Sequence, residues 1–188
     1  MSAEPVFVYA RINARVMPMD RGERYEDPLA DALEANGLGT VTGGGTGQTA
    51  DGEIEYCGID IDLLNLERGL PFVGQLLAGC GAPKGSQLEY EQDGQRKSLP
   101  FGFLEGLALY LNGTDLPDEV YKSSDVNVVY DEINRLLGDR GSIQGHWEGP
   151  TETALYLYGY SAEEMRQKIA DFVGTYPLCQ KSRLVQIA

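Results

Sequence analysis

Four carboxylates in the first half of the sequence form its densest group of side chains that could do chemistry. Glu53 and Glu55 alternate with apolar residues, and so do Asp60 and Asp62. The alternation slips near Cys57-Gly58, where a β-bulge would return all four acids to one strand face. Such carboxylates can bind Mg²⁺ or Ca²⁺, or act as a general acid and base. Because the segment lacks the ligand-rich turn of a calcium loop, we favour a solvated face or a negatively charged docking surface.

His146 and Trp147 are the only histidine and the only tryptophan of the chain, and they are adjacent. A single histidine cannot complete the usual zinc sites. No Gly-x-Ser-x-Gly motif supplies a nucleophile that it could activate. An exposed tryptophan would anchor a protein partner, whereas a buried one would seal an end of the core. We therefore expect no catalytic residue here.

Tyrosines alternate with leucines over residues 155–158, so this predicted strand is apolar on both faces. Strands of that kind are usually covered on both faces. We expect Tyr156 and Tyr158 to be buried between the two halves of the chain or against a second subunit, as in a homodimer. The alternative is an aromatic cleft for a small ligand. The predicted partner-binding residues are Glu53, Glu55, Asp60, Asp62, His146, Trp147, Tyr156 and Tyr158.

The segment Gly45–Ala50 formally matches the glycine fingerprint of dinucleotide-binding proteins. That fingerprint works because a helix N-terminus follows the glycines, whereas the turn signal Asp51-Gly52 and a predicted strand follow here. We expect a hairpin tip, with no bound nucleotide or other cofactor and no metal site. Cys57, Cys80 and Cys179 lack paired spacing and indicate small buried residues in a reducing compartment.

The elements that must position these residues occur twice along the chain. Gly39–Gly43 and Gly141–Gly145 share their glycine spacing with a β-branched residue between. In the first half we expect strands at 6–12, near 40, at 53–63 and at 86–91, with helices from Asp27-Pro28 and at 66–78. In the second half we expect strands at 107–111, 142–147, 152–160 and 183–187, with helices starting near 125 and at 162.

Each half thus has the order β-α-β-β-α-β, which is the ferredoxin-like unit. We predict an α+β fold of two tandem ferredoxin-like repeats, residues 1–94 and 95–188, with antiparallel sheets and helices on one face. The polar segment 92–100 is expected to join them. Helical spacing predicts a second-half core that contains Val129, Ile133, Leu136, Ile169, Phe172 and Val173.

The chain of 188 residues carries 29 acidic and 15 basic side chains, a net charge of −14. This charge disfavours nucleic acids and anionic membranes as partners, since both need a positive surface. No apolar run approaches the roughly 18 residues of a membrane-spanning helix, and a secretory signal pattern is absent. We therefore expect a cytoplasmic protein.

These observations favour a non-catalytic acidic binding protein. Its most concrete form is an immunity protein or antitoxin that binds and neutralises a basic bacterial effector. Such an inhibitor needs only a rigid scaffold and an acidic surface for fast electrostatic capture. Two alternatives stay open: a small-molecule sensor, and an enzyme with scattered catalytic residues in a groove between the repeats.

Overall fold

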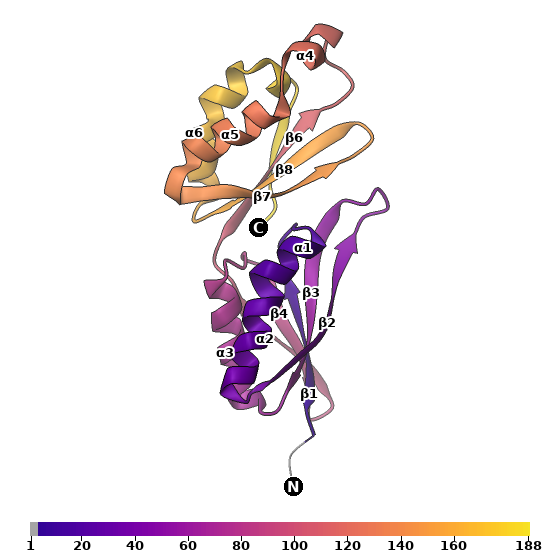
Figure 1. Cartoon of the computed structure of the whole chain (residues 1–188), viewed down its shortest axis with the longest axis vertical. Helices are drawn as coiled ribbons and strands as arrows, with labels where there is room; N and C mark the ends of the chain where they lie inside the picture. Colours follow the sequence, from indigo (N-terminus) through magenta and orange to yellow (C-terminus); the bar gives the residue numbers. More distant parts are fainter. Residues whose placement is uncertain (1–3) are drawn as a thin grey trace. The chain divides into compact units, whose positions relative to one another are not determined.

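The computed structural model describes residues 4–188, which form two compact units. The first unit comprises the chain up to Thr49 together with Ile54–Phe103. The second comprises Ala50–Glu53 together with Leu104–Ala188. Each unit has its own antiparallel sheet and its own helices (Figure 1).

The first unit contains a five-stranded sheet. Its elements are β1 (Val6–Ile12), α1 (Pro18–Arg21), the π-helical segment η1 (Gly22–Glu26), α2 (Asp27–Asn36), β2 (Gly39–Gln48), β3 (Ile54–Leu63), α3 (Leu66–Gly79), β4 (Ser86–Gln92) and β5 (Gln95–Phe101). The strands lie in the order β2-β3-β1-β4-β5, and all neighbours are antiparallel. The first four strands therefore have the ferredoxin-like order, and β5 extends the sheet beside β4.

The second unit contains a four-stranded sheet. Its elements are β6 (Glu105–Asn112), α4 (Asp118–Ser123), α5 (Val126–Leu137), η2 (Gly138–Arg140), β7 (Gly141–Glu148), β8 (Glu152–Gly159), α6 (Ala162–Thr175), η3 (Pro177–Cys179) and β9 (Arg183–Gln186). The order β7-β8-β6-β9 repeats that of the first unit. The predicted α+β fold of two tandem ferredoxin-like repeats is confirmed.

The boundary between the units lies later than the predicted division at residues 94 and 95. Residues 95–101 pair with β4 along their whole length, from Ser86 opposite Phe101 to Gln92 opposite Gln95. The turn between these strands, Asp93-Gly94, has φ values of 55° and 71°, as a type I′ hairpin requires. The segment that we expected to join the repeats is thus a hairpin of the first unit, which ends at Phe103.

Short polar side chains fix the starts of three helices. The Asn65 carboxamide accepts a hydrogen bond from the Arg68 amide at the start of α3, and the Asp125 carboxylate accepts one from Asn127 at the start of α5. The Ser161 hydroxyl accepts one from the Glu164 amide at the start of α6. Each bond satisfies an amide that has no partner inside its helix.

The helices of the second unit pack one stripe of side chains against its sheet. Of the predicted core residues, Val129, Ile133 and Ile169 are fully buried. Leu136, Phe172 and Val173 pack against this cluster but are only partly buried. The helical periodicity therefore identified the inward face of the helices correctly. It also included residues at the margin of that face, which are only partly buried. Phe172 lies at its margin, where its ring stacks on Tyr176 with centroids 5.1 Å apart.

Candidate functional site

The helices of the first unit cover one face of its sheet and leave the other face open (Figure 1). On the central strand β1, Val8, Ala10 and Ile12 are fully buried. Phe7 and Tyr9 alternate with them and so point to the opposite face. Phe7 is 54% exposed, which is unusual for a phenylalanine in the middle of a sheet. The open face therefore has an aromatic centre.

Carboxylates flank this aromatic centre on both neighbouring strands. Asp60 of β3 lies opposite Tyr9 on one side, and Glu89 of β4 lies opposite it on the other. Asp62 lies opposite Phe7. Buried Ile59, Ile61 and Leu63 alternate with Asp60 and Asp62, so the two acids share the open face.

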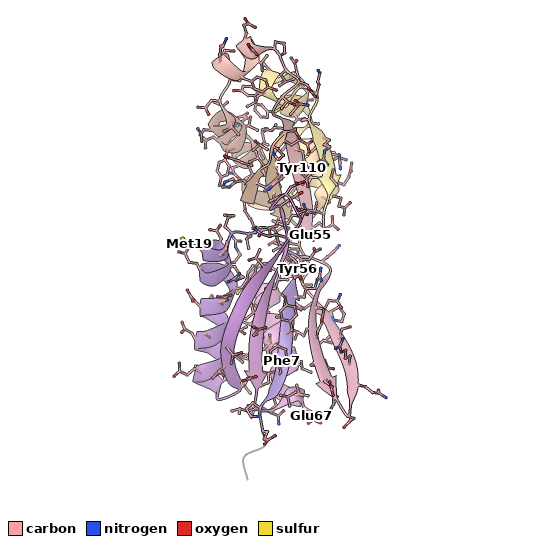
Figure 2. The ribbon with its side chains drawn as sticks, turned by 90° about the vertical axis from the view of Figure 1, so that its right-hand side faces the viewer. Phe7, Met19, Glu55, Tyr56, Glu67 and Tyr110 are labelled. Carbon is pink, nitrogen blue, oxygen red and sulfur yellow. The ribbon has the colours of Figure 1, made fainter. Side chains whose placement is uncertain are left out.

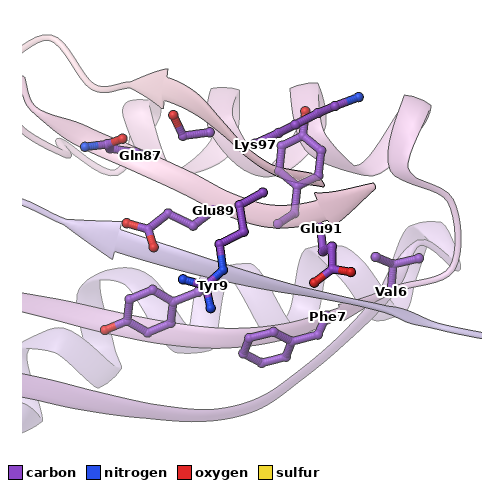
Figure 3. A pocket seen from close by; sticks show the side chains of 10 residues that line it. Val6, Phe7, Tyr9, Gln87, Glu89, Glu91 and Lys97 are labelled. Carbon is purple, nitrogen blue, oxygen red and sulfur yellow. The ribbon is translucent and has the colours of Figure 1, made fainter. Parts of the chain in front are cut away.

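A groove of about 700 Å³ runs over the β4 side of this face. Figure 3 shows Phe7 and Tyr9 on β1, with Glu89 and Glu91 from β4 among the other lining side chains. Arg96 and Lys97 of β5 line its outer side. In this groove the acidic and aromatic groups come from β1 and β4, and the basic groups come from β5, where Arg96 lies directly opposite Glu91.

Two glycines make room for the tyrosines of this face. A Cβ atom at Gly58 would collide with the Tyr9 ring and hydroxyl, and one at Gly47 would collide with the Tyr56 ring. The Arg11 guanidinium lies 3.7 Å from the centroid of the Tyr56 ring, which is a cation–π contact. The two rings therefore lie directly against the glycine backbone, where a side chain would displace them.

The pKa of the Tyr9 phenol is raised above its ordinary value. Burial is the main cause, because it disfavours the phenolate. Tyr56 and Asp60 raise the pKa further, and Arg11 opposes them. Tyr9 is therefore a neutral hydroxyl at physiological pH, able to donate a hydrogen bond beside Asp60.

The four acids that the sequence grouped together do not lie together. A bulge is present in β3, but it falls at Glu55, because Gly47 pairs with Tyr56 and Gln48 pairs with Ile54. The pairing of β3 with β1 is regular at the predicted position, where Gly58 lies opposite Arg11 and Cys57 lies opposite Ile12. Asp60 and Asp62 share the open face, and Glu55 is exposed at the bulge.

Glu53 belongs to the second unit and is engaged there. Its carboxylate accepts hydrogen bonds from the Tyr110 hydroxyl at 2.6 Å and from the Tyr156 hydroxyl at 2.9 Å. Tyr156 is fully buried and Tyr158 is 1% exposed. Both tyrosines are therefore buried, and neither contributes exposed surface for a partner.

His146 and Trp147 lie on β7 of the second unit and have different surroundings. The Trp147 indole is partly buried and donates to the Asp51 carbonyl at 3.4 Å. His146 is exposed and lines a separate cavity. Sequence reasoning missed Glu89 and Glu91, although the alternation in Leu88-Glu-Tyr-Glu91 is a usable signal for their shared face.

Two of the three cysteines are buried, as predicted. Burial raises the pKa of Cys57 to about 12 and that of Cys179 to about 11. Cys80 is only partly buried, and its pKa is raised less far.

We expect iodoacetamide at pH 8 to modify Cys80 at least about tenfold faster than Cys57 or Cys179, because the thiolate is the reactive form. Mass spectrometry of peptides from a time course measures the three rates. In denaturant the three modification rates should become similar. Equal rates in the folded protein would contradict this assignment of burial.

Among residues 4–188, no group of three or more histidine, cysteine or acidic side chains is placed to hold a metal ion. Gly45 and Gly47 lie within β2, paired with Gly58 and Tyr56, so no helix N-terminus follows them. Within the described part of the chain, no helix is long and apolar enough to span a membrane.

No protein-family model and no curated protein matches this sequence. Among solved structures, a candidate monooxygenase of Fusobacterium nucleatum is 9% identical, with 99% of this chain and 92% of that chain covered and a TM-score of 0.32. A second, from Lactobacillus acidophilus, is 11% identical, with 99% and 95% covered and a TM-score of 0.30. The first two RRM domains of the yeast poly(U)-binding protein Pub1 are 8% identical, with 96% and 99% covered and a TM-score of 0.26. Similarities this low transfer no activity, substrate or partner to this chain.

Proposed function

We propose that this protein is a non-catalytic binding protein that holds a cationic segment of a partner protein on the open face of its first sheet. The observation that carries the proposal is Phe7, a half-exposed aromatic ring on the central strand with Asp62 directly opposite. Lysine and arginine side chains bind favourably over an aromatic face and beside a carboxylate.

The distribution of charge supports the same partner. Asp60, Asp62, Glu89 and Glu91 all lie near the two rings. The net charge of −14 adds a long-range attraction for cations, which speeds encounter. Arg96 and Lys97 of β5 would repel the same segment, and so would orient it toward Asp60 and Asp62 of β3 rather than over β5.

An inhibitor of a basic effector, such as an immunity protein or antitoxin, is the form of this function that we propose. Covering a cationic surface requires no reaction, only a rigid face whose charges are already in place. The sheet supplies a regular backbone for such a face, because β1 pairs with β3 without interruption from Val6 to Ile12.

Phe7→Ala should weaken binding of a synthetic peptide of alternating lysine and serine by about threefold to tenfold, the worth of one cation–π contact. Met19→Ala is the matched control, since Met19 is 78% exposed on α1 of the same unit and lies away from Phe7 (Figure 2). Isothermal titration calorimetry measures both affinities. Equal affinity for a glutamate–serine peptide, or equal losses in the two variants, would contradict the proposal.

A further inference from the structure

The second unit contains a cavity of about 480 Å³ that is independent of the open face of the first sheet. Leu111, Leu155 and Leu178 contribute its buried apolar wall. Tyr130, His146 and Glu148 contribute polar atoms nearer to solvent. A mostly apolar wall with a few convergent polar groups, at this volume, is typical of small-molecule sites.

The polar groups of the cavity differ in whether they are already engaged. The Tyr121 hydroxyl donates to the Asn112 carbonyl at 3.2 Å and accepts from the Leu116 amide at 3.1 Å. Within residues 4–188, by contrast, the side chains of Tyr130, His146 and Glu148 make no hydrogen bond or ion pair, so they are available to a ligand.

His146 and Glu148 are two residues apart on β7, so their side chains project from the same face. They lie opposite Leu155 and Thr153 of β8, which also line the cavity. A polar edge thus stands directly beside the apolar wall.

The charge at this polar edge is negative. Glu148 is a carboxylate, and no lysine or arginine is among the described residues that line the cavity. The N-terminus of α5 reaches the cavity through Val126 and Asn127 and would by itself attract anions. Its cap is Asp125, whose carboxylate accepts from the Asn127 amide at 2.8 Å and from the Asn127 side chain at 2.9 Å. That carboxylate offsets the helix dipole, so a cationic ligand is favoured over an anionic one.

We infer that this cavity binds a small aromatic amine. The ring lies against Leu111, Leu155 and the Tyr130 ring, and the ammonium group donates to the Glu148 carboxylate. A ring nitrogen of His146 accepts a second hydrogen bond from the same ammonium. This site lies wholly within the second unit and does not depend on the binding surface proposed for the first.

Three indole compounds of similar size test the inference: tryptamine, the neutral alcohol tryptophol, and the anion indoleacetate. Titrations of the full chain are followed in ¹H–¹⁵N spectra. We expect tryptamine to shift the amide signals around His146, Glu148 and Leu155. Tryptophol should bind about tenfold more weakly, and indoleacetate more weakly still, because each loses the charge-assisted bond to Glu148.

Glu148→Gln should weaken tryptamine binding about tenfold and leave tryptophol binding unchanged. Asp171→Asn is the control, because Asp171 is an exposed acid on α6 outside the cavity. Equal binding of the amine and the anion, tryptamine shifts outside these residues, or loss of the amine preference in the Asp171 variant would overturn the inference. Phe7→Ala should leave all three titrations unaltered, which separates this result from failure of the proposed function.

Discussion

Asp60→Lys combined with Glu89→Lys is expected to slow association with a lysine–serine peptide by at least about tenfold at low salt. The two acids lie on either side of Tyr9 in the sheet register. Reversing them changes the local charge by four units beside the ring and turns attraction into repulsion. Stopped-flow measurements of the association rate, repeated over a range of salt concentrations, test this expectation.

The control for charge reversal is Glu34→Lys combined with Glu67→Lys. Both residues are exposed on helices of the same unit, and Figure 2 shows Glu67 away from Tyr56 and Glu55. The net charge changes equally, so a purely global effect would slow both variants alike. At 1 M salt, where the Debye length falls to about 3 Å, the two association rates should converge. Equal slowing in both variants at low salt would show that no particular face captures the peptide.

Ile133→Ala is expected to lower the free energy of unfolding by about 2–5 kcal/mol. Ile133 is fully buried on α5, within the cluster that α5 and α6 form with the second sheet. The truncation removes apolar contacts and leaves a cavity whose walls are strands and helices that cannot readily collapse. Urea titration followed by circular dichroism measures the loss.

Leu136→Ala on the same helix is the matched comparison. Leu136 is only partly buried, so its truncation exposes less new cavity surface and should cost clearly less. A comparable loss in the free energy of unfolding at both positions would contradict the difference in burial between Ile133 and Leu136. An altered denaturant slope in either variant would instead indicate a change in the denatured state.

The elements with strong local signals could be predicted from the sequence. The helix α5 has a wide apolar stripe and a capping aspartate, and α6 begins at a capping serine; both were expected. The strand β5 was missed, because nearly all its residues are exposed and no apolar alternation marks it. Its signal was the Asp93-Gly94 dipeptide, which is typical of a hairpin turn rather than a linker.

The candidate site was predictable only in part. The position of a bulge decides which residues of a strand point to a given face of the sheet. The sequence indicated a bulge but not its position, and moving it to Glu55 separates Glu53 from the other acids. Glu53 instead meets Tyr110 and Tyr156, partners more than fifty residues away that no local pattern indicates. Glu89 and Asp60 lie near each other only because β3 and β4 both pair with β1. The sequence does not reveal this order of strands.

The two edges of the first sheet bear on how a partner can approach it. The outer edge of β5 carries Arg96, Lys97 and Pro100, and charges and proline on an edge strand oppose the addition of another strand. The opposite edge, β2, has a bulge at Thr42, because Val41 pairs with Ile61 and Gly43 pairs with Asp60, and this bulge disturbs the hydrogen-bonding row that a new strand would need. Backbone-to-backbone recognition is therefore discouraged on both sides, which also protects the protein against edge-to-edge aggregation at high concentration. The partner that we propose would then be recognised through side chains on the open face, so its sequence rather than its backbone would decide whether it binds.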